Sequence, residues 1–439
     1  MEKNLYPEIY QIRRKRFVSQ LDESSCLILP NNNHYFRSND VEYRFRPDSS
    51  FFYLTGFEEP NSACIIIKHK KDFEYILFVE PRNKEMELWT GRNIGIEGAK
   101  NIYKADKAFP ISDLKSKLKE LISKSKNIYY PLGVNQQLEA SLTKNIYELQ
   151  KNSRGGIKSP SCIHDSRNII YKMRLIKDKN ELTWIRKAIH ISKEAHLAAI
   201  KHSRPKMFEY ELESIIEGIF RRLGANGPAY PTIVGSGHNA TTLHYIKNNR
   251  LIKNGDLILI DAGAEYNYYA SDITRTFPAN KKFSGPQKDI YEIVLKAQTE
   301  AIKQIKPGKR FIDPHNKAVT VIVEGLKELK LLKGSTEKII RKEEYKQFFM
   351  HKLSHWLGLD VHDAGPYTDK KGDSIKLSPG MVLTVEPGIY ISNQSKVPKR
   401  FKGIGIRIED DVLVTKDGNE VLTREIPKSI EDLESLRAI

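Results

Sequence analysis

The sequence has 439 residues, of which 39% are hydrophobic and 29% are charged, a composition typical of a globular protein with a sizeable core. This length exceeds the usual size of a single hydrophobic core, so we expect two domains. The formal net charge is +17, but the lysines are spread along the chain without a nucleic-acid-binding motif, which argues against specific nucleic-acid binding.

The N-terminal segment MEKNLYPEIYQIRRKRF has no apolar stretch of the signal-peptide type, and no apolar run reaches the length of a membrane span. The three cysteines, Cys26, Cys64 and Cys162, lie far apart and lack metal-binding spacing. So few cysteines in so long a chain are typical of a reducing compartment. The sequence therefore predicts a cytoplasmic protein without a membrane partner.

Residues 1–172 are predicted to form an α/β domain, because strand-like segments occur there together with an amphipathic helix. The predicted strands are SACIIIKH (62–69), FEYILF (73–78) and NIYYPLGV (127–134). The predicted helix is DLKSKLKELISKSK (113–126), in which apolar residues recur at helical spacing. The segment 151–166 is rich in Gly, Ser and Pro and is predicted to be a loop or linker.

Residues 173–439 are predicted to form an α+β domain. Long amphipathic patterns indicate helices, and strand-like segments between and after them indicate antiparallel hairpins. The predicted helical segments are 174–203, 208–224, 289–305 and 314–332.

The segment LILIDAGAEYNYYASDITRTFP (257–278) places Asp261 and Asp272 among residues typical of buried strands. Buried carboxylates are unfavourable unless they are paired or bind a metal. If the segment is a hairpin that turns at Tyr266 and Asn267, the two aspartates face each other. Taken alone, such a pair more often serves as turn or capping residues.

A second acid pair changes that balance. Glu386 ends the apolar segment MVLTVE, and Glu409 lies within GIGIRIEDDVLVT. Across a loop centred near Val397, the two glutamates are predicted to lie opposite each other. Four carboxylates gathered in one place repel one another and raise one another's pKa, and bound cations relieve this repulsion.

The segment FFMHKLSHWLGLDVHDAG adds His351, His355 and His362. The first two have the spacing of a zinc HExxH motif, but Lys352 occupies the glutamate position, so that interpretation fails. One histidine as a metal ligand and two as substrate contacts is the simpler hypothesis. Four carboxylates and one neutral imidazole carry a formal charge of −4, which two divalent cations neutralise. Mostly oxygen ligands favour Mn²⁺, Co²⁺ or Fe²⁺.

Several ordered segments resemble one family. DAGAEYNYYASDITRTF, HKLSHWLGLDVHD, LTVEPGIYI and GIGIRIEDDVLV are similar, in order and spacing, to the active-site segments of Xaa-Pro aminopeptidases (aminopeptidase P). YPTIVGSGHNATTLHY, RFRPDSSFFYLTGFEEP and ELWTGR extend the resemblance over nearly the whole chain. It implies an N-terminal α/β domain followed by a C-terminal catalytic domain with the pita-bread fold. That fold is shared with prolidase and methionine aminopeptidase.

The resemblance also implies a role for each matching residue. The implied metal ligands are Asp261, Asp272, His355, Glu386 and Glu409. Asp261 would chelate one ion and His355 the other, Asp272 and Glu409 would bridge them, and Glu386 would also take the proton of the nucleophilic water.

The remaining implied site residues contact the substrate or support the ligands. They are His244, His351, His362 and Arg407 as catalytic residues, and Trp89, Tyr390 and Arg154 as substrate-binding residues. Arg154 would reach a neighbouring subunit's site.

The implied activity is hydrolysis of the N-terminal Xaa-Pro bond of peptides by a metal-bridging hydroxide between two divalent ions, most simply Mn²⁺. The implied assembly is a homodimer or homotetramer. Two alternatives remain at this point: a prolidase that cleaves only Xaa-Pro dipeptides, and a pita-bread module that binds peptides without catalysis.

Overall fold

The computed structural model describes residues 7–152 and 159–438. The chain divides into two compact units, Met1–Met173 and Arg174–Ile439, whereas the sequence prediction places the boundary between residues 172 and 173. No helix in the described ranges is long and apolar enough to cross a membrane.

The first unit is built on a six-stranded mixed sheet in the order β6-β5-β4-β1-β7-β8. Its strands are β1 (Ser25–Pro30), β4 (Ala63–Lys68), β5 (Phe73–Val79), β6 (Lys107–Pro110), β7 (Asn127–Tyr130) and β8 (Cys162–Asp165). β4 runs antiparallel to β1 and β5, and the other neighbours are parallel. The three predicted strands correspond to β4, β5 and β7, so these predictions are confirmed.

The same part of the chain contains seven α-helices and a small hairpin, and several of the helices pack against the six-stranded sheet. They are α1 (Pro7–Val18), α2 (Ser49–Thr55), α3 (Lys84–Thr90), α4 (Gly95–Asn101), α5 (Leu114–Ile122), α6 (Gln136–Lys151) and α7 (Arg167–Leu175), with β2 (Phe36–Ser38) and β3 (Val41–Glu42). The predicted helix at 113–126 is α5, whose Leu118 and Ile122 are buried against the sheet.

The predicted loop at 151–166 is partly wrong. Cys162–Asp165 forms β8, which pairs in parallel with β7. This segment becomes a strand because it pairs with β7, and the amino-acid composition of a segment does not reveal such pairing. Residues 153–158 lie outside the described part of the chain.

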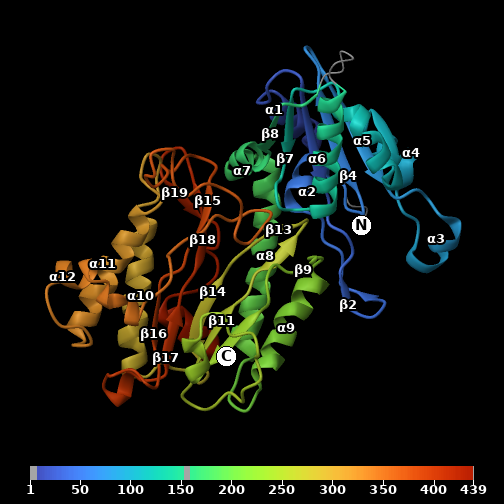
Figure 1. Ribbon diagram of the computed structural model, residues 1–439. Coiled ribbons are helices and arrows are strands. Elements are labelled where there is room, and N and C mark those ends of the chain that lie inside the picture. Colours follow the sequence, from blue (N-terminus) through green and yellow to red (C-terminus); the bar gives the residue numbers. More distant parts are fainter. Residues whose placement is uncertain (1–6, 153–158, 439) are drawn as a thin grey trace. The chain divides into compact units, whose positions relative to one another are not determined.

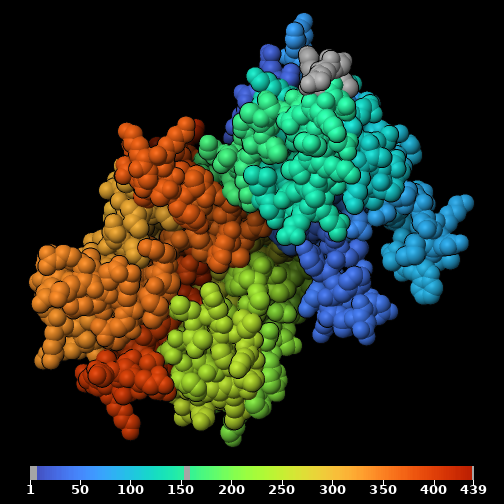
Figure 2. Space-filling view, viewed as in Figure 1, coloured from blue at the N-terminus to red at the C-terminus, as the bar shows by residue number. Residues whose placement is uncertain are grey.

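Helix α3 projects from the rest of the first unit (Figures 1 and 2). None of its side chains is buried. Leu88 is 88% exposed and Trp89 is 83% exposed. An apolar helix face without a cover is unusual on a monomer surface.

The second unit places two pairs of helices around antiparallel strands, α8 with α9 on one side and α10 with α11 on the other (Figure 1). Its helices are α8 (Lys179–His202), α9 (Glu209–Arg222), α10 (Gly285–Ile302), α11 (Asp313–Glu328), α12 (Thr336–Arg341) and α13 (Ile430–Ala438). The predicted helix at 174–203 begins later than expected. Asp178 accepts hydrogen bonds from the backbone of Asn180 and Glu181, and this capping box starts α8 at Lys179.

The strands of the second unit form small antiparallel sheets. One sheet contains β10 (Ile233–Ser236), β11 (Leu257–Asp261) and β14 (Thr274–Pro278), and another contains β9 (Gly227–Pro228), β12 (Ala264–Tyr266) and β13 (Tyr269–Ala270). β15 (Val382–Val385), β18 (Asp410–Val414) and β19 (Asn419–Val421) form the next, and β16 (Gly388–Ile391) pairs with β17 (Ile404–Arg407). This combination of helices and hairpins confirms the predicted α+β class.

Candidate metal centre

The first acid hairpin differs in register from the prediction. Asp261 pairs with Thr274, not with Asp272. The turn consists of Asn267 and Tyr268, both at positive φ, one position later than expected. Two-residue hairpin turns favour this left-handed geometry, which asparagine tolerates. Asp272 therefore precedes β14 and is not opposite Asp261.

Tyr230 brings the two aspartates together despite this register. Its Oη lies 2.7 Å from Oδ1 of Asp261 and 2.6 Å from Oδ1 of Asp272. A phenol carries one proton, so it can donate to only one of these oxygens at a time. Burial, followed by the charges of the two aspartates, raises the pKa of Tyr230 well above its ordinary value.

The second acid hairpin has the predicted register. Val385 pairs with Asp410 in one ladder, and Gly388 pairs with Arg407 in the next. The two ladders share one register, so Glu386 and Glu409 lie opposite each other where the ladders separate. Thr274 donates to Oε2 of Glu409 across 2.7 Å and thereby joins the second hairpin to the first.

His355 faces the acids from an irregular segment between α12 and β15. Its Nδ1 lies 3.0 Å from the carbonyl oxygen of Trp356, which can only accept a hydrogen bond, so Nδ1 carries a proton. Its Nε2 lies 3.2 Å from Oδ2 of Asp272 and 3.6 Å from Oε1 of Glu386. Burial opposes protonation, but the hydrogen bond to Asp272 and the acid charges raise the pKa of His355 to about 9.

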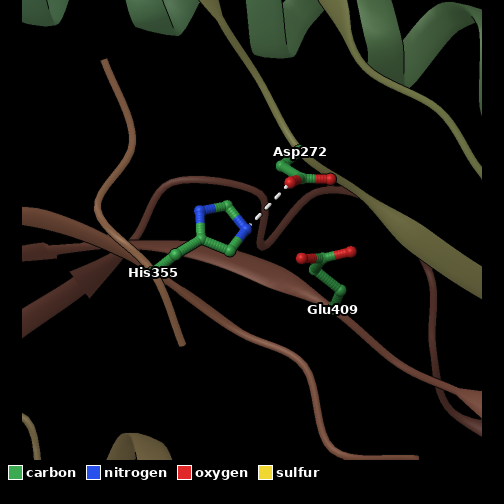
Figure 3. Close-up of side chains that lie close together, drawn as sticks. All are labelled: Asp272, His355 and Glu409. Carbon is green, nitrogen blue, oxygen red and sulfur yellow. Dashed lines mark ion pairs between the residues drawn. The ribbon is translucent and has the colours of Figure 1, made fainter. Parts of the chain in front are cut away.

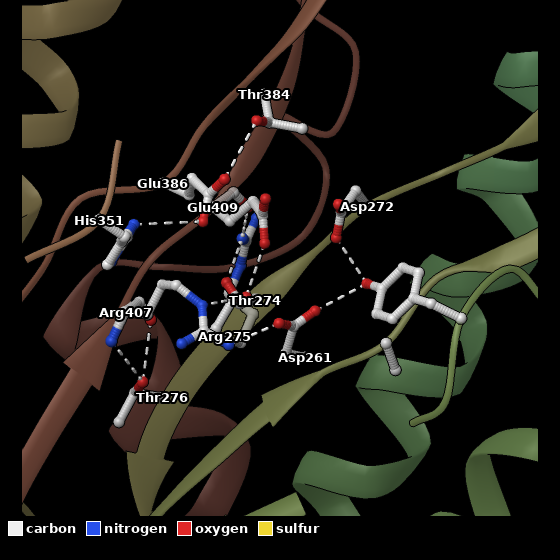
Figure 4. Close-up of polar contacts among 12 residues, drawn as sticks. Asp261, Asp272, Thr274, Arg275, Thr276, His351, Thr384, Glu386, Arg407 and Glu409 are labelled. Carbon is white, nitrogen blue, oxygen red and sulfur yellow. Dashed lines mark hydrogen bonds and ion pairs between the residues drawn. The ribbon is translucent and has the colours of Figure 1, made fainter. Parts of the chain in front are cut away.

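Three potential ligand atoms converge at this point. One oxygen of Asp272, one ring nitrogen of His355 and one oxygen of Glu409 lie within 4.8 Å of one another (Figure 3). Asp261 and Glu386 flank this group (Figure 4). A carboxylate–carboxylate–imidazole set of this size suits a divalent transition metal.

Arg407 connects Asp261 to Tyr390 and His351 through a directed chain of hydrogen bonds. Its Nη2 donates to Oδ2 of Asp261 across 2.5 Å, and its Nη1 donates to Oη of Tyr390 across 3.0 Å. His351 Nδ1 lies 2.8 Å from the carbonyl oxygen of Lys352, so Nε2 is left to accept from Tyr390 at 2.9 Å. Burial and the charge of Arg407 lower the pKa of His351 to about 3, which keeps its ring neutral.

These side chains surround a cavity of about 720 Å³ in the second unit. Nine residues predicted for the site line it: His244, Asp261, Asp272, His351, His355, His362, Glu386, Arg407 and Glu409. Tyr390 is only 2% exposed and is not among the residues that line the cavity, and its substrate-binding role stays a prediction. Trp89 belongs to the first unit, and Arg154 lies outside the described residues.

Comparisons with known proteins identify the family. The sequence matches metallopeptidase family M24 over residues 183–416 and the aminopeptidase P N-terminal domain over residues 10–129. It is 41% identical to a Xaa-Pro aminopeptidase of Haemophilus influenzae over 98% of this chain and 97% of that protein. The chain belongs to the aminopeptidase P group of family M24.

Solved structures of this group have the same fold over nearly the whole chain. The Pseudomonas aeruginosa aminopeptidase PepP is 45% identical, with a TM-score of 0.96 over 98% of each chain. The Escherichia coli aminopeptidase P solved with the inhibitor Pro-Leu is 40% identical, with a TM-score of 0.95 over 98% of each chain. The resemblance, the pita-bread catalytic domain and the N-terminal α/β domain are thereby confirmed, and the chain is a metal-dependent peptidase.

The buried acids fit the metal that family M24 implies. Burial raises the pKa of Asp261, and it raises the pKa of Glu386 to about 8. Burial and the neighbouring carboxylates raise the pKa of Glu409 well above its ordinary value. Arg407 is the one permanent cation buried among them in the described lining, so the carboxylates are under-compensated. Bound divalent cations supply the missing positive charge.

Sequence reasoning missed three residues that hold the aminopeptidase P acids in place. Tyr230 contacts both aspartates, Thr274 donates to Glu409, and Thr384 lies 3.4 Å from Glu386. All three occur in segments that carry the family resemblance, YPTIVG, DITRTF and LTVEPGIYI. For Thr274 and Thr384 the available signal was a hydroxyl in a buried strand, whereas Tyr230 lies in the bend between β9 and β10 and gave no such signal.

Proposed function

We propose that this chain removes the first residue of peptides whose second residue is proline. The observation that carries this proposal is the convergence of the two acid hairpins and His355 on one cavity. Proline in the second position is supported by full-length relatives named Xaa-Pro aminopeptidase. It is also supported by the Escherichia coli relative solved with Pro-Leu, because Pro-Leu is the product that such a cleavage of Xaa-Pro-Leu would leave.

The proposed metal ligands are Asp261, Asp272, His355, Glu386 and Glu409. The charge of these groups supports two divalent ions, and their mostly oxygen donors support Mn²⁺. When bound, such cations supply Lewis acidity to water and to a peptide carbonyl. The Nδ1–H contact of His355 with Trp356 directs its Nε2 toward the acids, as expected for an oriented imidazole ligand.

Glu386 is the proposed acceptor of the water proton. It lines the cavity, lies at the edge of the Asp272–His355–Glu409 group and has no arginine or lysine partner in the described residues. A general base must lie within hydrogen-bond reach of the proton that it takes from the reacting water.

The hydrogen bonds of the histidines support a different proposed task for each. Both ring nitrogens of His351 are occupied, so it offers its ring as a wall for proline. His244 and His362 line the cavity and make no hydrogen bond within the described ranges, so their N–H groups can donate to the scissile carbonyl oxygen. Such donors stabilise the charge that develops on that oxygen.

A homodimer or homotetramer is the proposed assembly, supported by the uncovered apolar face of α3. Leu88 and Trp89 are more than four-fifths exposed, at 88% and 83%. The role of Trp89 at the lip of the substrate pocket, which the resemblance implies, stays a prediction. The proposed role of Arg154 and the cytoplasmic location remain predictions from sequence.

Peptide hydrolysis after metal loading tests the proposed function. We expect the Mn²⁺-loaded protein to cleave Xaa-Pro-Yaa, and the chelated protein and Glu386→Gln to lose at least a hundredfold in rate. Xaa-Ala-Yaa is the control substrate and should be cleaved poorly. Cleavage confined to Xaa-Pro dipeptides would establish prolidase activity instead, and no hydrolysis with no bound metal would indicate a peptide-binding module.

A further inference from the structure

A second cavity of about 560 Å³ adjoins the catalytic one. The two cavities share Lys352, Ser354 and Tyr367 in their walls. The second cavity is otherwise lined by the start of α11 and by the turn that contains the isolated bridge between Thr368 and Ser374. The two cavities therefore lie next to each other.

The wall of the second cavity combines rigid aromatic rings with unpaired polar groups. Phe311 packs at 4.5 Å from Trp356 and 5.1 Å from Tyr367, measured between ring centroids. In the described part of the chain, Nδ1 of His315 and Oγ of Ser354 are buried without a hydrogen-bond partner. Buried polar groups of proteins are normally satisfied. A peptide backbone carries hydrogen-bond donors and acceptors that can pair with these two atoms.

Lys352 places a positive charge at the junction of the two cavities. Its side chain is exposed, and it pairs with no carboxylate within the described ranges. Glu343, whose pKa the charge of Lys352 helps to lower, is already paired with Lys346 at 2.6 Å. His315, which also faces this lysine, is kept neutral because burial and the charges of Lys352 and Lys346 lower its pKa to about 4.

We infer that the second cavity receives the part of the substrate that follows proline, and that Lys352 pairs with a carboxylate there. This inference rests on the proposed function, because that function sets the direction of the peptide. An aminopeptidase leaves one residue before the scissile bond, and the catalytic cavity has to hold that residue together with the bond itself. The remainder of the peptide must leave on another side, and the ammonium of Lys352 suits its negative end.

The length of a tripeptide matches this arrangement. In Xaa-Pro-Yaa the α-carboxylate lies two residues beyond the scissile bond, or about 7 Å in an extended chain. In a longer peptide an acidic side chain at the third position supplies the same group. Lys352 therefore acts as a specificity-determining residue for short peptides and for peptides with Asp or Glu in third place.

A comparison of acid and amide substrates tests this role. We would measure kcat/KM of the Mn²⁺-loaded protein for Ala-Pro-Ala, Ala-Pro-Ala amide and Ala-Pro-Asp amide. We expect the free acid to exceed the Ala amide by roughly two- to fivefold through KM, as for one exposed charge pair. If the Asp amide is cleaved as well as the free acid, Lys352 recognises a carboxylate on the third side chain as well as one at the chain end. In Lys352→Gln the three values should converge.

Lys346→Gln is the matched control, since Lys346 is exposed nearby but lines neither cavity. It should keep the acid preference. Binding of Pro-Leu and Pro-Leu amide, measured by calorimetry without turnover, separates the two proposals. If no peptide is cleaved but Pro-Leu binding still depends on Lys352, the proposed aminopeptidase function is wrong and the proposed carboxylate-binding role of Lys352 is supported. Equal handling of acid and amide by the unaltered protein, or a preference that survives Lys352→Gln, overturns the inference.

Discussion

The guanidinium of Arg407 donates to the carboxylate of Asp261 across 2.5 Å, joining β17 to β11 inside the second unit. Its other nitrogens donate to Oγ1 of Thr274 and to Oη of Tyr390. One planar group therefore orients a proposed metal ligand, the strand beside it and the tyrosine that supports His351. A flexible ammonium cannot make all three contacts in one plane.

Arg407→Lys should consequently reduce kcat/KM and Mn²⁺ affinity by about ten- to a hundredfold, the range found when a residue that orients a metal ligand is lost. Peptide hydrolysis and metal titration provide the two measurements. Arg400→Lys, at an exposed position outside the cavity, should change neither quantity. Activity within twofold of the unaltered protein would show that Arg407 is not required to orient Asp261.

Tyr230→Phe should weaken metal binding by roughly tenfold and leave the fold intact. The change removes the only hydroxyl that contacts both aspartates in the described residues, while the ring keeps its packing. Calorimetric titration with Mn²⁺ gives the affinity. Tyr210→Phe is the control, because Tyr210 is 50% exposed. An unchanged affinity would refute a positioning role for Tyr230.

Asp363 holds the segment that carries His362. Its Oδ1 accepts from Arg174 across 2.5 Å, and its Oδ2 accepts from Lys177 across 2.9 Å, with only 4% of the residue exposed. Asp363→Asn should lower the free energy of unfolding by about 3–5 kcal/mol, because it leaves two buried cations under-compensated. Urea titration measures this loss, and exposed Asp289→Asn serves as the control. A change below 1 kcal/mol would rule out the predicted structural role.

The stability of the protein should depend on pH through His196. Burial lowers the pKa of His196 from 6.5 to about 4, so the folded state keeps the ring neutral where the unfolded state takes up a proton. Above pH 6.5 the ring is neutral in both states and does not change the free energy of unfolding. As the pH falls from 6.5 toward 4, protonation of the unfolded state lowers that free energy by about 3 kcal/mol in total. Urea unfolding of the chelated protein at pH 7, 6 and 5 should show a flatter dependence for His196→Gln. The exposed His202→Gln should retain the original slope.

Trp89→Ala should leave the unfolding free energy within 0.5 kcal/mol of the unaltered value, about what exposed positions tolerate. If α3 contacts a partner subunit, the same variant should shift the assembly toward monomers and raise KM. Light scattering and peptide kinetics measure these effects. Lys84→Ala on the same helix is the matched control. A stable monomer in the unaltered protein would contradict the proposed assembly.

The sequence by itself determined the chemistry of the site. Acids in apolar strands indicate a metal, and the spacing of Glu386 and Glu409 predicts their opposition correctly, because a hairpin register depends only on local counting. For Asp261 and Asp272 the same counting failed, because the turn lies at Asn267 and Tyr268, one position later than expected, and this moves the partner of Asp261 by two residues to Thr274.

Only the tertiary structure decided which partners complete the site. Tyr230 lies 31 positions from Asp261, and Arg407 lies 146 positions from it. Tyr390 proved to support His351 and Arg407 rather than to line the cavity. Contacts at such separations depend on how helices and sheets pack around one core, and that packing is not encoded in any local pattern of residues.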